Sequence, residues 1–313
     1  MAKPDFDLII IGAGPAGLTA AQYGSRANLE VLIIEQLAPG GQALNIDMLE
    51  NYPGIIPAKP GYDFSEDLRR QAEKFGARFL TEAVVSLRKE GDRFVMDLGN
   101  GETRSAWAVI LATGTKHHTL NIPGEAEFYG RGVSYCAACD GPFFKGKKML
   151  VVGGGDTACD EAQYLSRLSP QVLLIHRREK FRAQKALAER ALHNPAIEVR
   201  FNTRLREIRG EKQVASVLLE RTDRGELYEE DTAAVFIFAG ASPRTSLVPD
   251  LRTDDNGYLI TDQTMASSLP GLFAAGDVRA TPFRQVVVAA GEGAVAAHSA
   301  AAYIDALKGE VYR

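Results

Sequence analysis

The chain has 313 residues, of which 45% are hydrophobic, and its formal net charge is −4. This length suits two domains, and the composition is ordinary for globular cores that need no disulfide staples. The negative charge argues against a general affinity for nucleic acid or for an anionic membrane.

The apolar runs, the first residues and the cysteines of the sequence indicate where in the cell the protein is expected. No apolar run approaches the roughly 20 residues that a membrane span needs, so we expect no membrane association. The first residues lead directly into a strand-like segment at 8–11, which predicts no signal or transit peptide. Three cysteines are too few for a disulfide scaffold, so we expect a cytoplasmic protein whose close cysteine pair is catalytic or metal-binding.

A dinucleotide-binding pattern covers residues 7–35. Its apolar strand is followed at once by Gly12-x-Gly14-x-x-Gly17, which opens a helix, and a second apolar strand then ends in Glu35. The glycines permit a tight turn, a close approach of the backbone to a pyrophosphate, and close packing of helix on strand. The start of the helix attracts phosphate, and the acid is suited to accept hydrogen bonds from ribose hydroxyls.

The same pattern returns from residue 149. A strand leads into Gly153-x-Gly155-x-x-Ala158 and a helix, but a basic cluster stands where an acid would end the second strand. The cluster follows His176 and consists of Arg177, Arg178 and Arg182. An acid would repel the 2′-phosphate of NADPH, whereas arginines bind it through charge-assisted hydrogen bonds. The second unit is therefore predicted to prefer NADPH over NADH; the alternative is a solvated basic face.

Three later apolar strands complete the two units. The strand at 107–114 ends in a glycine turn, the one at 234–240 is its counterpart in the second unit, and the one at 272–277 ends in Asp277. We expect Asp277 to bind the polyol chain of a flavin, or otherwise to cap a helix or turn. The order predicts an α/β fold of two Rossmann-like domains, the second inserted into the first. The predicted domains are 1–115 plus 247–313 for FAD, and 116–246 for NADPH and the cysteine pair.

The segment Cys136-x-x-Cys139 carries the predicted redox chemistry. Two cysteines at this spacing close a small disulfide ring, and such a context lowers the thiol pKa so that the thiolate can attack or leave. Asp140 is the candidate general acid and base beside the pair. A structural zinc site needs four ligands, usually with a second pair, so no metal is predicted. Cys159 is expected to be a small buried residue.

These residues closely resemble the low-molecular-weight, bacterial-type thioredoxin reductases, which are pyridine nucleotide-disulfide oxidoreductases. The similarity runs through segments 12–17, 40–42, 50–54, 112–114, 132–141, 153–158, 176–183, 275–277 and 284–285. It implies a homodimer whose nicotinamide domain rotates about hinges near 115–118 and 244–247. It also implies that NADPH reduces the flavin, which opens the Cys136–Cys139 disulfide, and that the resulting dithiol reduces thioredoxin by exchange.

The resemblance also assigns the cofactor residues. FAD is expected at Gly12, Gly14, Pro15, Ala16, Gly17, Glu35, Gln36, Gly41, Gln42, Asn51, Val84, Ala112, Thr113, Gly114, Gly276, Asp277, Arg284, Gln285 and Val286. NADPH is expected at Gly153, Gly155, Asp156, Thr157, Ala158, His176, Arg177, Arg178 and Arg182. Cys139 is expected nearer the flavin, with Asp140 supplying its proton, and either cysteine is a candidate to attack thioredoxin first.

Some positions leave alternatives open. Pro142-Phe143-Phe144 stands where relatives have an apolar patch that receives the partner, although both phenylalanines also suit a core. Arg131 matches a position that touches the partner in relatives, or is a solvated arginine. No role is assigned to the segment 116–118.

Three other functions are alternatives for this sequence. A related disulfide enzyme would use another acceptor. A ferredoxin–NADP reductase of this type would lack the cysteine pair. A nucleotide-sensing or zinc-stapled module would be colourless, whereas the enzyme is expected to be yellow.

Overall fold

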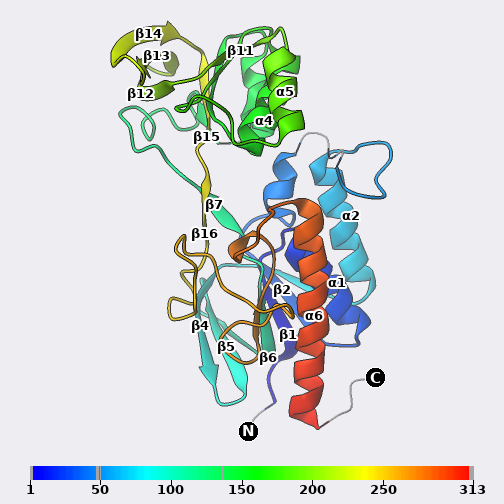
Figure 1. The fold of residues 1–313 in the computed structure, drawn as a ribbon. Coiled ribbons are helices and arrows are strands. Elements are labelled where there is room, and N and C mark those ends of the chain that lie inside the picture. Colours follow the sequence, from blue (N-terminus) through cyan, green and yellow to red (C-terminus); the bar gives the residue numbers. More distant parts are fainter. Residues whose placement is uncertain (1–2, 47–48, 50, 136, 310–313) are drawn as a thin grey trace. The chain divides into compact units, whose positions relative to one another are not determined.

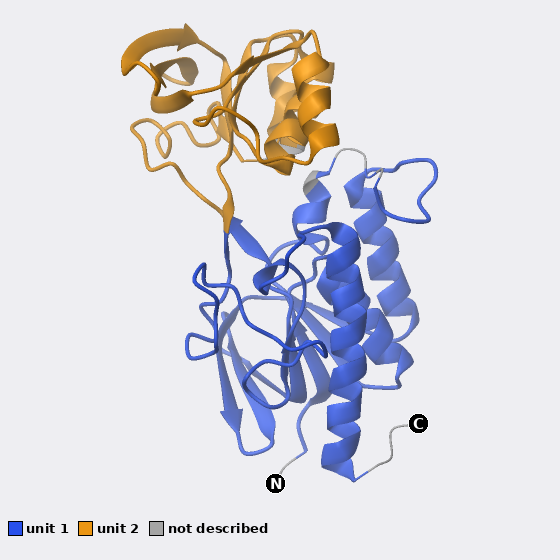
Figure 2. Ribbon diagram, in the orientation of Figure 1, with its two compact units in different colours: residues 1–116, 242–313 blue, residues 117–241 orange. Residues whose placement is uncertain are grey.

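A computed structural model describes residues 3–46, 49, 51–135 and 137–309, and the chain divides into two compact units (Figure 2). Unit 1 consists of Met1–Lys116 and Ser242–Arg313, and unit 2 is His117–Ala241. Each is built on a sheet with parallel strands, so the predicted α/β class, with one Rossmann-like unit inserted into the other, is confirmed. The predicted boundaries after residues 115 and 246, and the cofactor assigned to each domain, stay predictions.

The described part of unit 1 has one large sheet in the order β3-β2-β1-β6-β5-β4, with β17 also paired to β6 (Figure 1). Its strands are β1 (Phe6–Ile11), β2 (Val31–Glu35), β3 (Arg78–Thr81), β4 (Val84–Glu90), β5 (Arg93–Leu98), β6 (Thr103–Leu111) and β17 (Leu272–Ala274). Its helices are α1 (Pro15–Arg26), α2 (Gly61–Lys74) and α6 (Val286–Lys308), with the 3₁₀ turns η1 (Gly41–Asn45) and η3 (Gly276–Val278).

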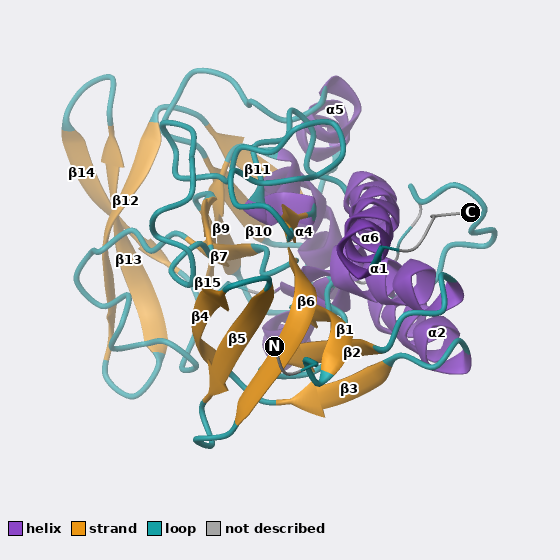
Figure 3. Cartoon of the chain, turned by 90° about the horizontal axis from the view of Figure 1, so that it is seen from below, coloured by secondary structure: helices purple, strands orange, loops and turns teal. Residues whose placement is uncertain are grey.

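The apolar runs of unit 1 become strands because both faces of its sheet are covered. In β1, Leu8 and Ile10 point into a core shared with α1, α2 and α6, which lie side by side (Figure 3). Ile9 and Ile11 point the other way, into a second core that includes Leu259. A strand buried on both faces needs a continuous apolar run rather than an alternating one, which is the pattern found in the sequence.

Helix α6 packs closely against α1. A Cβ atom on Gly293 would lie 2.1 Å from the carbonyl oxygen of Ala16, so the helices touch through their backbones. By length and composition alone α6 is also apolar enough to cross a membrane, and the expectation that no such run exists was wrong. The alanines that permit the close contact also raise the hydropathy of the helix. In the structure 44% of its most apolar stretch is buried, and Ala296, Ala300 and Ile304 pack into the core that α6 shares with α1.

The described part of unit 2 has a parallel sheet in the order β11-β10-β9-β15-β8 and an antiparallel sheet in the order β12-β13-β14. Its strands are β8 (Val133–Ser134), β9 (Met149–Gly153), β10 (Val172–Ile175), β11 (Ile197–Arg200), β12 (Thr203–Gly210), β13 (Val214–Arg221), β14 (Glu226–Asp231) and β15 (Ala234–Phe238). Its helices are α3 (Ala137–Asp140), α4 (Asp156–Leu168) and α5 (Lys185–His193), with the 3₁₀ turn η2 (Gly141–Phe144). The segments that join the units, β7 (Thr115–His117) and β16 (Ala241–Pro243), pair as a two-stranded sheet.

The parallel sheet of unit 2 is also buried on both faces. Val151 and Phe236 point into a core with residues of α4 and α5, whereas Leu150 points into a core with Leu205 and Leu219 of the antiparallel sheet. The small sheet therefore covers the face that the helices leave open.

The close contact between α1 and α6 predicts opposite effects for two glycines of α6. Gly293→Ala forces the backbones apart and should lower the free energy of unfolding by about 1–3 kcal/mol. Gly291 is exposed, with no atom within 4 Å of an added Cβ, so Gly291→Ala should raise it by about 0.5–1 kcal/mol. Thermal unfolding midpoints of the two variants would measure this, and a change of the same sign in both would contradict the packing.

Candidate functional site

The predicted flavin residues of unit 1 lie along the carboxyl edge of its sheet. Strands β1, β2, β6 and β17 are parallel and in register, so their carboxyl ends meet at one edge. The N–H of Ala112 donates to the carbonyl of Ile11 at 2.8 Å, and that of Ala275 donates to Leu111 at 3.0 Å. These bonds attach the loops carrying residues 112–114 and 276–277 to this edge, where ligands of open α/β sheets bind.

The first glycine loop leaves space for a dinucleotide. A Cβ on Gly17 would lie 1.9 Å from the carbonyl oxygen of Gly12, so only glycine lets α1 pack onto the turn this closely. Gly14 is the N-cap residue of α1 and supplies no side chain, and no atom lies within 4 Å of its Cβ position. The first N–H groups of the helix are thus open to an anion such as a pyrophosphate.

Glu35 lies at the end of β2 and organises the loops around it. Its Oε2 accepts a hydrogen bond from the N–H of Ala13 at 2.8 Å, and its Oε1 accepts one from Leu37 at 3.0 Å. The N–H of Gly40 also donates to the carbonyl of Ala13 at 2.7 Å. The segment that contains Gln36 and Gly41 is therefore held against the glycine loop, and each carboxylate oxygen keeps a lone pair for a ribose hydroxyl.

Other predicted flavin residues contact one another within unit 1. Asn51 Nδ2 donates to Gln285 Oε1 at 3.1 Å, which joins two segments that are 234 residues apart. Gln42 Nε2 donates to Thr115 Oγ1 at 2.6 Å. Val84 starts β4 and is half-buried. The structure thus brings together residues that the sequence places far apart.

Asp277 stands in the turn η3 and is half-buried. Burial raises the pKa of its carboxyl group, the negative charge of Glu292 raises it further, and Arg284 lowers it. The guanidinium of Arg284 lies 3.9 Å from the ring centroid of Tyr258. A half-buried carboxyl group at the carboxyl edge suits a ligand hydroxyl, as predicted for the polyol chain of a flavin.

In unit 2 the segment after β10 folds back onto the second glycine loop. The N–H of Arg182 donates to the carbonyl of Gly154 at 2.7 Å. Asp156 accepts hydrogen bonds from both the N–H and the side-chain amide of Gln184, each at 2.7 Å. These bonds bring the exposed Arg182 to the start of α4, and Arg177 and Arg178 are exposed as well. Gln184 was not predicted, because nothing in the sequence signals a pairing across 28 residues.

His176 is the buried member of this group. Its Nε2 has no hydrogen-bond partner among the described residues, which is unusual for a buried polar atom. Burial lowers the pKa of its imidazole, and the positive charges of Arg182 and Arg178 lower it further. The carboxyl edge of this sheet therefore holds a neutral, buried imidazole with one unpartnered nitrogen, beside the exposed arginines.

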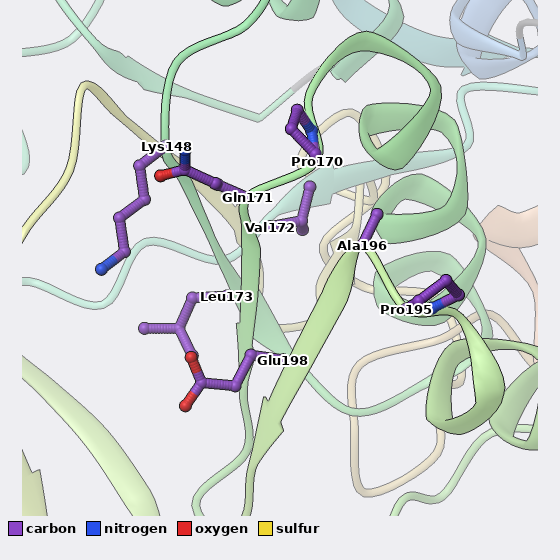
Figure 4. Close-up of a pocket in the computed structure, with 8 residues that line it drawn as sticks. All are labelled: Lys148, Pro170, Gln171, Val172, Leu173, Pro195, Ala196 and Glu198. Atoms are coloured by element: carbon purple, nitrogen blue, oxygen red, sulfur yellow. The ribbon is translucent and has the colours of Figure 1, made fainter.

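A hollow of about 300 Å³ in unit 2 lies away from these residues (Figure 4). It is lined by Lys148, Pro170, Gln171, Val172, Leu173, Pro195, Ala196 and Glu198. Lys148, Gln171 and Ala196 directly precede β9, β10 and β11, so the hollow marks the amino edge of the sheet. That edge lies opposite the helix start and glycine loop, and the hollow contains none of the predicted site residues.

The redox segment is only partly described. Cys136 lies outside the described residues, and so does the side chain of Cys139. The backbone of 137–140 forms α3, and the Asp140 side chain is half-buried. A Cβ on Gly141 would lie 2.8 Å from a methyl carbon of Leu165 in α4. Unit 2 therefore holds the end of this segment tightly against the helix that starts at its own glycine loop.

The residues after the cysteines divide into surface and core. Phe143 is 76% exposed, whereas Phe144 packs in the core with its ring centroid 6.3 Å from that of Phe236. Arg131 is exposed, and its guanidinium lies 5.8 Å from the ring of Phe128.

Cys159 is fully buried, as predicted, and burial raises the pKa of its thiol to about 11. No cluster of three or more His, Cys, Asp or Glu side chains within the described ranges is placed to hold a metal ion.

A buried carboxylate that the sequence analysis missed supports the backbone before the cysteines. Glu125 is 3% exposed and accepts hydrogen bonds from Leu120 N–H at 2.8 Å, Asn121 N–H at 2.6 Å and Tyr135 OH at 2.7 Å. Burial and the charge of Glu125 raise the pKa of the Tyr135 hydroxyl above its ordinary range. The ring of His117, in β7, stacks on Tyr135 with centroids 6.1 Å apart. This contact anchors the backbone one residue before Cys136.

Comparisons with known proteins show what the whole chain is similar to. The family model for pyridine nucleotide-disulphide oxidoreductases matches residues 6–293. A thioredoxin reductase of Treponema pallidum is 54% identical over 98% of this chain and 99% of that protein. The solved thioredoxin reductase of Lactococcus lactis has a TM-score of 0.92 and 39% identity over 96% of this chain and 99% of its own. That of T. acidophilum has a TM-score of 0.91 and 33% identity over 97% and 100%.

The Glu125 cluster predicts unequal costs for two variants. Tyr135→Phe removes one donor and leaves the carboxylate with its backbone partners, so it should lower the free energy of unfolding by about 1–2 kcal/mol. Glu125→Ala leaves several donors unpaired and should cost on the order of 3 kcal/mol or more. Thermal unfolding of the two variants would compare them. Equal losses would mean that the carboxylate does not hold the loop through its backbone contacts.

Proposed function

Because this chain belongs to the pyridine nucleotide-disulphide oxidoreductase family, we propose that it is a thioredoxin reductase that takes electrons from NADPH and passes them to thioredoxin through FAD and the Cys136–Cys139 pair. Family membership implies a flavin and a nicotinamide nucleotide. The observation that carries the proposal is the end-to-end similarity to thioredoxin reductases in a chain that retains two glycine loops and a C-x-x-C segment.

We propose that unit 1 holds FAD along its carboxyl edge. The open start of α1 would take the pyrophosphate, Glu35 the ribose hydroxyls and Asp277 the polyol chain. Arg284, Gln285 and Val286, at the start of α6, would contact the same ligand. When bound, a flavin accepts two electrons from a nicotinamide and gives them to a disulfide.

We propose that unit 2 holds NADPH through the loop at Gly153 and the basic cluster after β10. The exposed side chains of Arg177 and Arg182 are free to form bidentate contacts with a 2′-phosphate, which a carboxylate at the end of the strand would repel. The unpartnered Nε2 of His176 supports a polar ligand at the same place.

We propose that the cysteine pair does the disulfide chemistry. The thiolate of one cysteine attacks one sulfur of the thioredoxin disulfide and forms a mixed disulfide with it. The other thioredoxin sulfur leaves as a thiolate. The second cysteine of the pair then attacks the sulfur of the first in the mixed disulfide. The Cys136–Cys139 pair is thereby oxidised to a disulfide, and thioredoxin is released as a dithiol. Asp140 would move the proton to and from Cys139. The exposed Phe143 would offer the partner an apolar contact, with Pro142 altering its shape.

The remaining features of the proposal concern motion and assembly. The chain crosses between its two units after residue 116 and again after residue 241, within the first and just before the second of the segments 115–118 and 244–247, and the short strands β7 and β16 pair there. We propose that these segments are the hinges. We further propose a homodimer, as the resemblance to thioredoxin reductases implies; the cytoplasmic location stays a prediction of the sequence.

The basic cluster predicts a cofactor preference that can be measured. Replacing both Arg177 and Arg182 with alanine should raise the KM for NADPH about tenfold or more, since each lost charge-assisted contact is worth about 1.5–3 kcal/mol. The KM for NADH should change less than about twofold, because NADH has no 2′-phosphate. Steady-state rates with either nucleotide would decide this.

The matched control removes two positive charges elsewhere in the same unit, with Arg206→Ala in β12 and Lys212→Ala in the turn between β12 and β13. These should leave both KM values unchanged. An equal rise for NADPH and NADH in the Arg177 and Arg182 variant would show that the cluster does not recognise the 2′-phosphate.

The proposed function predicts that a cysteine variant separates two half-reactions, which are the reduction of the flavin by NADPH and the reduction of thioredoxin. Purified wild-type protein should be yellow and should oxidise NADPH rapidly only when oxidised thioredoxin is present, with a poor response to NADH. Cys139→Ser should abolish thioredoxin reduction, while NADPH still bleaches the flavin absorbance under anaerobic conditions, because only the disulfide is lost. Stopped-flow absorbance would record both events.

Cys159→Ala is the control for this experiment, because Cys159 is buried and should leave both half-reactions intact. Slow NADPH oxidation that thioredoxin does not stimulate would exclude thioredoxin as the acceptor. Loss of flavin bleaching in the Cys139 variant would exclude the proposed order of electron transfer.

A further inference from the structure

A buried carboxylate of α6 binds both ends of the turn that carries Asp277. Glu292 is 8% exposed, and its Oε2 accepts a hydrogen bond from the N–H of Gly276 at 2.8 Å. Its Oε1 forms an ion pair with the guanidinium of Arg279, whose Nε also donates to Thr261 Oγ1 at 2.8 Å. Gly276 and Arg279 flank the turn, so one side chain closes it from both sides.

This turn needs support from outside its own backbone. Gly276 is left-handed, with φ of 74°, so the chain turns away from the direction of β17 at this residue. The turn follows directly from β17, and the Arg279 N–H closes it by donating to the carbonyl of Gly276 at 3.1 Å. The Glu292 carboxylate supplies the acceptor that Gly276 requires, since a buried N–H is almost always paired.

The position of Glu292 on α6 links two groups of proposed flavin residues. The helix starts at Val286 with Gln285 as its N-cap residue, and Glu292 lies about two turns further on. Because Glu292 is tied to Gly276 and Arg279, the turn with Asp277 cannot move relative to the start of α6. The two groups of ligands are thereby held at a fixed spacing.

We propose that Glu292, together with Arg279, is a positioning residue for the flavin, which holds Asp277 and the start of α6 in the arrangement that binds it. This inference rests on the proposed function, in which unit 1 binds FAD. Glu292 itself touches the turn rather than the ligand.

The electrostatics indicate that Glu292 positions the turn and does not serve to stabilise the charged form of Asp277. The negative charge of Glu292 opposes ionisation of Asp277 rather than assisting it, and it is Arg284 that favours the charged form. A buried ion pair is moreover weak evidence for stability, because desolvation of both charges offsets their attraction. What the carboxylate contributes is therefore a directed set of contacts that an apolar side chain of the same size would not make.

The opposite end of α6 offers a matched control. Asp7 is also 8% exposed, accepts a hydrogen bond from the Glu30 N–H at 3.0 Å, and pairs with Lys308 at 2.7 Å. Asp7 therefore has the same kinds of partner as Glu292, which are one backbone N–H and one cationic side chain. It also joins α6 to the rest of unit 1. It lies by the amino end of β1, away from the carboxyl edge, so its loss should affect stability alone.

The experiment compares FAD binding by the deflavinated full-length proteins, titrated with FAD and followed by quenching of flavin fluorescence. Glu292→Ala should raise the Kd for FAD at least tenfold. Glu292→Gln keeps an oxygen for Gly276 but loses the charge for Arg279, so it should raise the Kd about threefold and partly rescue binding. Asp7→Ala should lower the unfolding midpoint of the protein while its Kd stays within about twofold of the wild-type value.

Two results would overturn the inference. One is an unchanged Kd in the Glu292 variants, and where Glu292→Ala does not fold, Glu292→Gln alone decides. The other is an increase in Kd for Asp7→Ala as large as that for Glu292→Ala at a similar loss of stability. Wild-type protein that binds no FAD would instead overturn the proposed function itself, so the two failures are distinct.

Discussion

Backbone N–H groups at the start of a helix, open to a phosphate, are the constraint on which both units depend. Such a site needs a strand that ends under a tight turn and a helix that begins at once, so the residue at the crossing must be small, and it is Gly17 in unit 1 and Ala158 in unit 2. At Gly17 an added Cβ would meet the Gly12 carbonyl oxygen, and α6 meets α1 just as closely at Gly293. The packing of unit 1 therefore follows from the geometry of its phosphate turn.

Carboxylates bound to backbone N–H groups then position the loops around these turns. Glu35, Glu125 and Glu292 each accept at least one hydrogen bond from a backbone N–H of a loop or turn. A loop has N–H groups that no neighbouring strand satisfies, so a charged acceptor on a rigid element both satisfies and locates it. The three acids differ in their second partner: a further loop N–H for Glu35, Tyr135 for Glu125 and Arg279 for Glu292.

Local signals explain which parts of this arrangement the sequence predicted. Apolar runs located β1, β2, β6, β9, β10, β15 and β17, most of them next to a glycine turn, because burial on both faces leaves a continuous pattern. The antiparallel sheet β12–β14 was not predicted, since its strands are half-exposed and alternate with charges. The acids that hold the loops were also missed, apart from Glu35, which follows its strand at the spacing of a known motif. Glu292 pairs across 16 residues with no local signal, and only folding distinguishes it from an exposed glutamate.

The two units share one architecture and differ at the residue after the second strand, and this difference is where we place the choice of nucleotide. In unit 1 the position holds Glu35, whose charge is stabilised by two backbone N–H groups and would repel a further phosphate. In unit 2 it holds His176, which burial and neighbouring arginines keep neutral, with Arg177 and Arg178 exposed beside it. A carboxylate suits hydroxyl donors, and guanidinium groups suit phosphate oxygens. Under the proposed function, the charges at and directly after the end of this strand would direct two similar dinucleotides to separate units of one chain.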